Sequence, residues 1–101
     1  MNDWYQKPVA EGRFLYDNTV EMPMYLIEQN YDYFYTMYDA DGMLEEGEKP
    51  QLNSEGLVYY LFFGELPSKP PYGVSDQGVF MSIDEAKKWA ENELPYFSHW
   101  L

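Results

Sequence analysis

The sequence predicts an α+β fold: a small antiparallel sheet of about four to five strands with one C-terminal helix packed on it. Short segments rich in Tyr, Phe, Leu and Val recur along the chain, separated by Gly, Pro, Asn and Asp, and this pattern is typical of antiparallel strands joined by turns. A helix start signal followed by helically spaced apolar residues lies near the C-terminus. The 101 residues are expected to form a single domain, residues 1–101.

Two strands are expected in the first third of the chain. Residues 13–16 form the first, and Asp17-Asn18 reads as the turn that ends it. Pro23 interrupts the next segment, and a strand resumes over residues 25–28. Asn30 is then expected to close a hairpin into the aromatic segment that follows.

Residues 31–48 join an aromatic run to a run of carboxylates, and the sheet is expected to be organised around them. The Tyr, Phe and Thr residues of 31–38 favour a β-strand with rings on both faces, which indicates an internal strand. Asp41-Gly42 predicts a hairpin, because a type I′ turn needs positive φ at both central residues. Residues 43–49 would return as a short partner strand.

The most hydrophobic segment is residues 57–63, LVYYLFF. It is apolar on both faces, which predicts a central strand. Residues 66–78 are rich in Pro and Gly and predict a long loop, in which Pro70-Pro71 would present Tyr72 to a partner. Residues 79–81 are expected to form a short strand or to pack against the start of the helix.

The helix is expected over residues 82–94. Ser82 and Glu85 form a capping box, and Pro95 ends the helix. The side chains expected to pack on the sheet are Ile83, Ala86, Ala90 and Leu94, with Trp89 at the edge of that face. The apolar tail, residues 96–101, is expected to dock on the body or to lie in an oligomer interface.

The charge balance excludes several functions. With 18 acidic and 6 basic side chains the net charge is −12, so direct binding to nucleic acid or to an anionic membrane is unfavourable. There is no cysteine, the single histidine is His99, and no phosphate-binding glycine motif occurs, so we expect no enzyme and no cofactor. Without a secretion signal or a long apolar segment, a cytoplasmic location is expected.

Calcium is an alternative ligand for the acidic run. The EF-hand loop pattern can be laid on it, with Asp39, Asp41 and Glu48 on ligand positions. The first ligand position, however, falls on Met37, which offers no hard oxygen, and the expected flanking helices are replaced by an aromatic strand and Pro50. We therefore predict no metal site.

A basic protein surface is the other positively charged ligand that the acidic run could bind. Carboxylates interleaved with tyrosines complement Arg and Lys, because the tyrosine ring adds contact area, a hydroxyl and a face for cation–π contact. The predicted partner is a basic protein, such as a nucleic-acid-binding enzyme. The candidate partner-binding residues are Asp39, Asp41, Glu45, Glu46, Glu48, Tyr35, Tyr38 and Tyr72.

In size, charge and tyrosine content the chain resembles nuclease-toxin immunity proteins and phage inhibitors of restriction or CRISPR nucleases. The resemblance implies a small inhibitor that occludes a nucleic-acid-binding surface. The alternative is a housekeeping α+β module that forms a homodimer through its aromatic strands and tail, or binds a small ligand.

Overall fold

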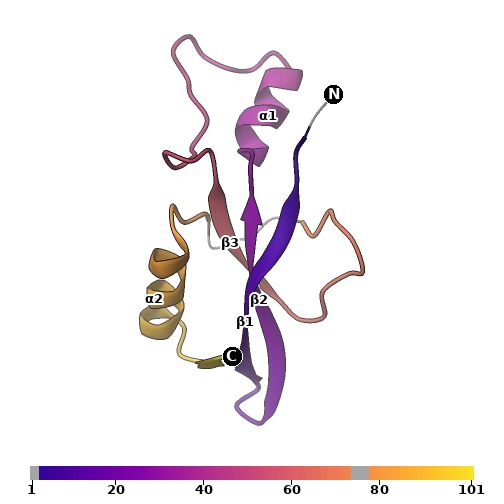
Figure 1. Cartoon of the computed structure of the whole chain (residues 1–101), viewed down its shortest axis with the longest axis vertical. Helices are drawn as coiled ribbons and strands as arrows, with labels where there is room; N and C mark the ends of the chain where they lie inside the picture. Colours follow the sequence, from indigo (N-terminus) through magenta and orange to yellow (C-terminus); the bar gives the residue numbers. More distant parts are fainter. Residues whose placement is uncertain (1–2, 74–77) are drawn as a thin grey trace.

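The computed structural model describes residues 3–73 and 78–101. Four strands form one antiparallel sheet in the order β3-β2-β1-β4. They are β1 (Gln6–Tyr16), β2 (Val20–Gln29), β3 (Val58–Phe63) and β4 (Phe97–Trp100), and the two helices are α1 (Tyr33–Ala40) and α2 (Ile83–Glu93). The predicted α+β class is confirmed: α2 contacts β3 and β4 beside the sheet, while α1 stands beyond the end of β2 (Figure 1).

A long hairpin of β1 and β2 forms the centre of the sheet. Asp17 and Asn18 have φ of +55° and +57° and make the predicted turn, as a type I′ geometry requires. Both strands are longer than predicted, and Pro23 does not interrupt β2. The reason is that Pro23 lies where the pairing of β2 with β3 ends: its carbonyl oxygen accepts a hydrogen bond from the Gly64 amide at 2.8 Å, and only the reciprocal bond, which needs a proline amide, is missing.

The main core lies between the sheet and α2. Met24, Leu26 and Leu61 point toward the helix from β2 and β3, and Ala86 and Ala90 of α2 are fully buried against them. The capping box is confirmed, because Ser82 Oγ accepts a hydrogen bond from the Glu85 amide at 3.0 Å. The predicted packing face is wrong at one position, since Ile83 in the first turn remains 37% exposed.

Strand β3 lies at an edge of the sheet, not at its centre as predicted. Its outer edge is closed by an isolated bridge in which Tyr59 and Phe80 exchange two backbone hydrogen bonds of 2.9 and 2.7 Å. Residues are buried on both faces of this strand, because Tyr60 on β3 and Ile27 on β2 are buried on the face opposite to α2. The two-sided apolar pattern therefore reflects burial on both faces and not a central position.

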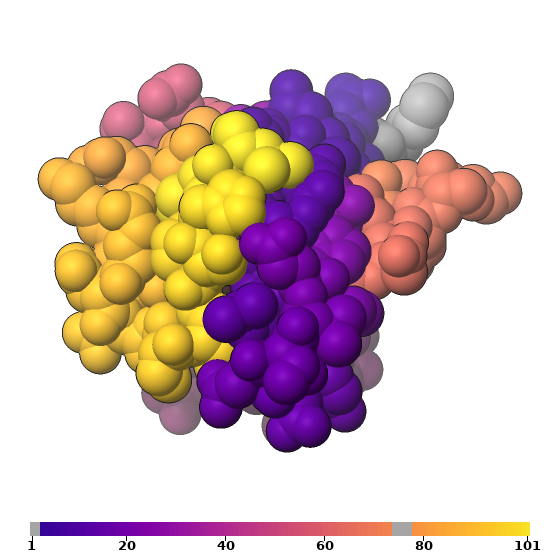
Figure 2. Space-filling model, turned by 90° about the horizontal axis from the view of Figure 1, so that it is seen from below, coloured from indigo at the N-terminus to yellow at the C-terminus, as the bar shows by residue number. Residues whose placement is uncertain are grey.

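The C-terminal tail docks on the body as β4, paired with β1. Gly12 makes this pairing possible, since a Cβ atom there would lie 2.9 Å from the ring of Trp100 and 3.0 Å from the carbonyl oxygen of His99. Figure 2 shows the end of the molecule away from α1, where the β1–β2 hairpin lies beside the C-terminal segment and the loop after β3 projects to one side.

The aromatic segment is a helix, and the prediction of an internal strand over residues 31–38 is wrong. The predicted hairpin at Asp41-Gly42 and the hairpin at Asn30 are therefore also absent, and residues 43–49 form turns and irregular structure. This correction changes the exposure of the predicted binding residues.

Candidate partner-binding surface

Helix α1 is defined by its caps. One carboxylate oxygen of Asp32 accepts a hydrogen bond from the Tyr35 amide at 3.2 Å, as an N-cap does, and the other accepts from the Gln51 amide at 2.8 Å. At the other end Gly42 has φ of +68°, and the amide of Met43 donates to the carbonyl oxygen of Tyr38 at 2.8 Å. This is a Schellman end, so the positive φ that predicted a hairpin terminates a helix instead.

No residue of α1 is buried. Surface helices of globular proteins normally bury an apolar stripe, and α2 does so here. On α1 and just after it, large apolar side chains are instead exposed, with Phe34 at 52% and Met43 at 65%. The others are Tyr33, Met37 and Tyr38.

The five predicted carboxylates follow these rings. Asp39 lies in the last turn of α1 and Asp41 is its C-cap, where the negative end of the helix dipole disfavours an anion. Glu45 and Glu48 close a turn, since the Glu48 amide donates to the Glu45 carbonyl oxygen at 3.2 Å. Glu46 lies within that turn, and all five side chains are exposed. Glu48 Oε2 also accepts a hydrogen bond from the Glu45 amide at 3.1 Å, which stabilises this turn locally.

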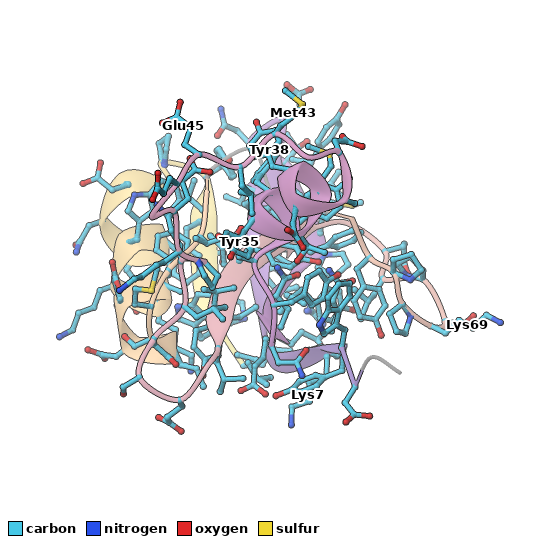
Figure 3. All side chains as sticks on the ribbon, turned by 90° about the horizontal axis from the view of Figure 1, so that it is seen from above. Lys7, Tyr35, Tyr38, Met43, Glu45 and Lys69 are labelled. Atoms are coloured by element: carbon cyan, nitrogen blue, oxygen red, sulfur yellow. The ribbon has the colours of Figure 1, made fainter. Side chains whose placement is uncertain are left out.

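We call the exposed rings and these carboxylates the α1 surface. Figure 3 looks down on this end of the molecule: Tyr35, Tyr38, Met43 and Glu45 lie together on α1 and the loop after it. Lys7 and Lys69 lie toward the periphery of the same view. The structure thus gathers rings and carboxylates at one end of the molecule.

An open cavity of about 240 Å³ lies between α1 and the loop after it, and we call it the α1 pocket. It brings together Tyr35 and Tyr38, two of the predicted binding residues, with a third, Glu48. Its other walls include Phe34, Leu44 and Lys49.

Tyr72 does not line this pocket. It lies in the loop after β3, where its amide donates to Gln6 Oε1 of β1 at 2.8 Å, and its side chain is half-buried. The neighbouring Pro71 and Gly73 share a separate small cavity with Tyr33 at the start of α1. Tyr72 therefore belongs to the region beside the base of α1 and not to the acidic loop.

The sequence prediction did not include Phe34, Met37 and Met43 in the surface, because a strand would have placed Phe34 and Met37 inside the sheet. One signal could have identified the helix. Asp32 and Asp41-Gly42 bracket eight residues, which is the spacing of an N-cap and a C-terminal glycine around a two-turn helix.

A buried carboxylate lies on the α2 side of the sheet. Glu28 accepts hydrogen bonds from the hydroxyls of Tyr5 at 2.7 Å and Tyr59 at 3.3 Å, and pairs with Lys7 at 3.4 Å. Burial raises the pKa of Glu28, but the Tyr5 hydrogen bond and the Lys7 charge outweigh it, so that the pKa lies below its usual value. The same hydrogen bond raises the pKa of Tyr5 to about 12. Glu28 lies on β2, Lys7 on β1 and Tyr59 on β3, so these contacts join the three strands.

Ser98, His99 and Glu21 meet on the exposed surface near β4. Ser98 Oγ lies 2.9 Å from His99 Nδ1, and a carboxylate oxygen of Glu21 lies 3.8 Å from the same nitrogen. In a catalytic triad the nucleophile and the acid contact opposite ring nitrogens, so this arrangement differs from one.

Within residues 3–73 and 78–101, no group of three or more His, Asp or Glu side chains is arranged to hold a metal ion. In the same part of the chain, no helix is long and apolar enough to cross a membrane. No known family model matches the sequence, and no similar protein was found among the curated proteins or the solved structures.

Proposed function

We propose that this chain is a small acidic binding protein that covers the basic, nucleic-acid-binding surface of a protein partner. One observation carries the proposal: α1 buries none of its residues and presents exposed rings beside five exposed carboxylates. Solvent-exposed rings without a packing role are typical of an interaction surface.

The chemistry of the α1 surface complements Arg and Lys. Tyr33 and Tyr38 offer ring faces and hydroxyls, while Asp39, Asp41 and the three glutamates supply negative charge that a basic surface would neutralise. The net charge of −12 would also accelerate encounter with a cationic partner. A partner that binds nucleic acid would lose access to phosphate while these carboxylates occupy its Lys and Arg side chains.

The test is capture of partners from a nuclease-treated lysate of the source cells by the tagged chain, at low and at high salt. We expect a basic nucleic-acid-binding protein that is retained at low salt and weakened at high salt, because exposed charges are screened beyond about 8 Å at physiological ionic strength. Its nucleic-acid binding should fall as this chain is added.

The matched variants separate local charge from total charge. Glu45→Lys/Glu46→Lys reverses two charges on the α1 surface, and Glu91→Lys/Glu93→Lys reverses two exposed charges on α2. The first pair should abolish capture and the second should leave it. Equal capture by both double variants would contradict the proposal.

Self-association is the second candidate, and the exposed Phe34, Met37 and Met43 favour it. A homodimer through α1 would hide these side chains but would also bring two acidic loops together, which like-charge repulsion opposes. Light scattering decides the matter: a dimer that dissociates on Phe34→Ala substitution would support this function in place of the first.

A further inference from the structure

The α1 pocket has two kinds of wall. Phe34, Tyr35 and Tyr38 project from one side of the short helix and supply ring surface, and Leu44 in the following loop extends the apolar lining. Glu48, in the loop after the helix, adds a carboxylate side chain to the lining. A volume of about 240 Å³ is below the roughly 300–1,000 Å³ of most small-molecule sites, so a single side chain is the better match.

The carboxylates at the pocket differ in what they are already bound to. Both oxygens of Asp32 accept backbone hydrogen bonds, from Tyr35 and from Gln51, so Asp32 builds the pocket and has little capacity left for a ligand. Glu48 uses Oε2 to accept from the Glu45 amide at 3.1 Å. Within the described part of the chain its Oε1 has no protein donor, so Glu48 is the carboxylate that can bind an incoming group.

We propose that the α1 pocket receives an arginine side chain of the basic partner. The inference rests on the proposed function and adds the chemistry of recognition. A guanidinium group is planar, so it can stack on the rings of Tyr38 and Phe34 while its edge donates hydrogen bonds to Glu48. A lysine ammonium makes the charge contact but lacks the planar face, and an anion is repelled by the carboxylates.

Lys49 opposes this ligand and gives the proposal a sharper test. It is the one basic side chain among the residues that line the pocket, and within the described chain it forms no ion pair. Its charge would repel a guanidinium group. Removing that charge should therefore strengthen binding, whereas removal of a base from a structural ion pair would weaken the fold.

The probe is a capped Gly-Arg-Gly tripeptide, titrated into the full chain and followed by backbone amide chemical shifts. Matched Gly-Lys-Gly and Gly-citrulline-Gly peptides test the charge and the plane separately, since citrulline keeps the planar shape without the charge. We expect shifts concentrated in residues 34–51, with the arginine peptide binding more tightly than the lysine peptide and the citrulline peptide not binding.

Variants test each wall. Tyr38→Leu should weaken the arginine peptide by about two- to fivefold, the loss expected for an exposed cation–π contact, while Tyr38→Phe, which keeps the ring, should bind as the wild type does. Glu48→Gln should weaken it by a similar factor of about two to five, and Glu46→Gln, which removes a charge outside the pocket lining, by less. Lys49→Gln should bind more tightly than the wild type.

Equal affinity for the arginine and lysine peptides, or amide chemical-shift changes spread evenly over all acidic segments, would overturn the proposed arginine site. An unchanged affinity in Tyr38→Leu with an intact circular dichroism spectrum would do the same. These failures are distinct from failure of the proposed function: partner capture lost in Glu45→Lys/Glu46→Lys but unchanged in Tyr38→Leu would keep the basic partner and remove the arginine pocket. Arginine binding in the pocket without a captured partner would keep the arginine pocket and remove the proposed basic partner.

Discussion

The two helices use their apolar residues in opposite ways. Helix α2 packs Ala86 and Ala90 fully against the sheet and leaves its carboxylates in solvent. Helix α1 is also capped at both ends, yet none of its residues is fully buried, and Phe34 and Met37 remain exposed. Core packing therefore accounts for the apolar residues that α2 buries but only in part for those of α1, where Tyr33 and Phe34 share a cavity with Val58 and Tyr60 of β3 and remain exposed.

The largest expected effect comes from the core beside α2. Leu61→Ala removes a fully packed β3 side chain and should lower the free energy of unfolding by about 2–5 kcal/mol, because the cavity adds to the lost apolar burial. Chemical denaturation of both proteins measures it. If a single alanine substitution in α1 lowered the free energy of unfolding more than Leu61→Ala does, the contrast between the helices would be wrong.

The buried Glu28 should show an intermediate effect with a definite pH dependence. Glu28→Gln replaces a charged acceptor of the Tyr5 and Tyr59 hydroxyls and should cost roughly 1–2 kcal/mol at neutral pH. Because the folded state lowers the pKa of Glu28, its contribution is present above the unfolded value of about 4.3 and is lost as the pH falls through the lower folded value.

Denaturation of wild type and Glu28→Gln from pH 7 to pH 3 tests this. The difference between the two proteins should shrink on acidification, and a constant difference would contradict the account. In the alkaline direction the sign reverses. The pKa of Tyr5 is raised to about 12. The contribution of Tyr5 to the free energy of unfolding is therefore present below the unfolded pKa of about 10 and is lost as the pH rises through the folded pKa of about 12.

A smaller and local effect is expected at the start of α1. Asp32→Ala removes the N-cap of the helix and the hydrogen bond to Gln51, and loss of such a cap costs about 0.5–2 kcal/mol. Amide hydrogen exchange should accelerate in residues 35–40, while the amides of β2 and β3 keep their protection. Asp32→Asn, which retains an acceptor oxygen, is the matched control, and equal acceleration across the whole sheet would show that α1 is part of the cooperative core.

The sequence was informative where local signals and tertiary packing agree. The capping box at Ser82 and the Asp17-Asn18 turn both have the geometry that their residues favour. Residues 31–40 carry conflicting signals, because rings favour strands while Asp32 and Gly42 favour a capped helix. In the structure the caps prevail, and no neighbouring strand pairs with this segment within the described chain.

The exposure of the predicted site residues could be foreseen only in part, for the same reason. The carboxylates lie in solvent whichever secondary structure precedes them, so their exposure could be predicted from composition. The exposed rings could not, because strand periodicity places Phe34 and Met37 inside a sheet and helix periodicity places them on a free surface. Only the paired caps carry that information, and pairing them requires reading both ends of the segment together.

The central claim is that the apolar side chains of α1 stabilise the fold less than a single core side chain beside α2 does. The most direct measurement is the free energy of unfolding of the triple variant Phe34→Ala/Met37→Ala/Tyr38→Ala, compared with the wild type by chemical denaturation. We expect a loss of no more than about 1–2 kcal/mol, because Phe34, Met37 and Tyr38 remain 52%, 36% and 39% exposed and alanine favours a helix. A loss greater than that of Leu61→Ala alone would mean that α1 belongs to the core, and the rings would then not be available to a partner.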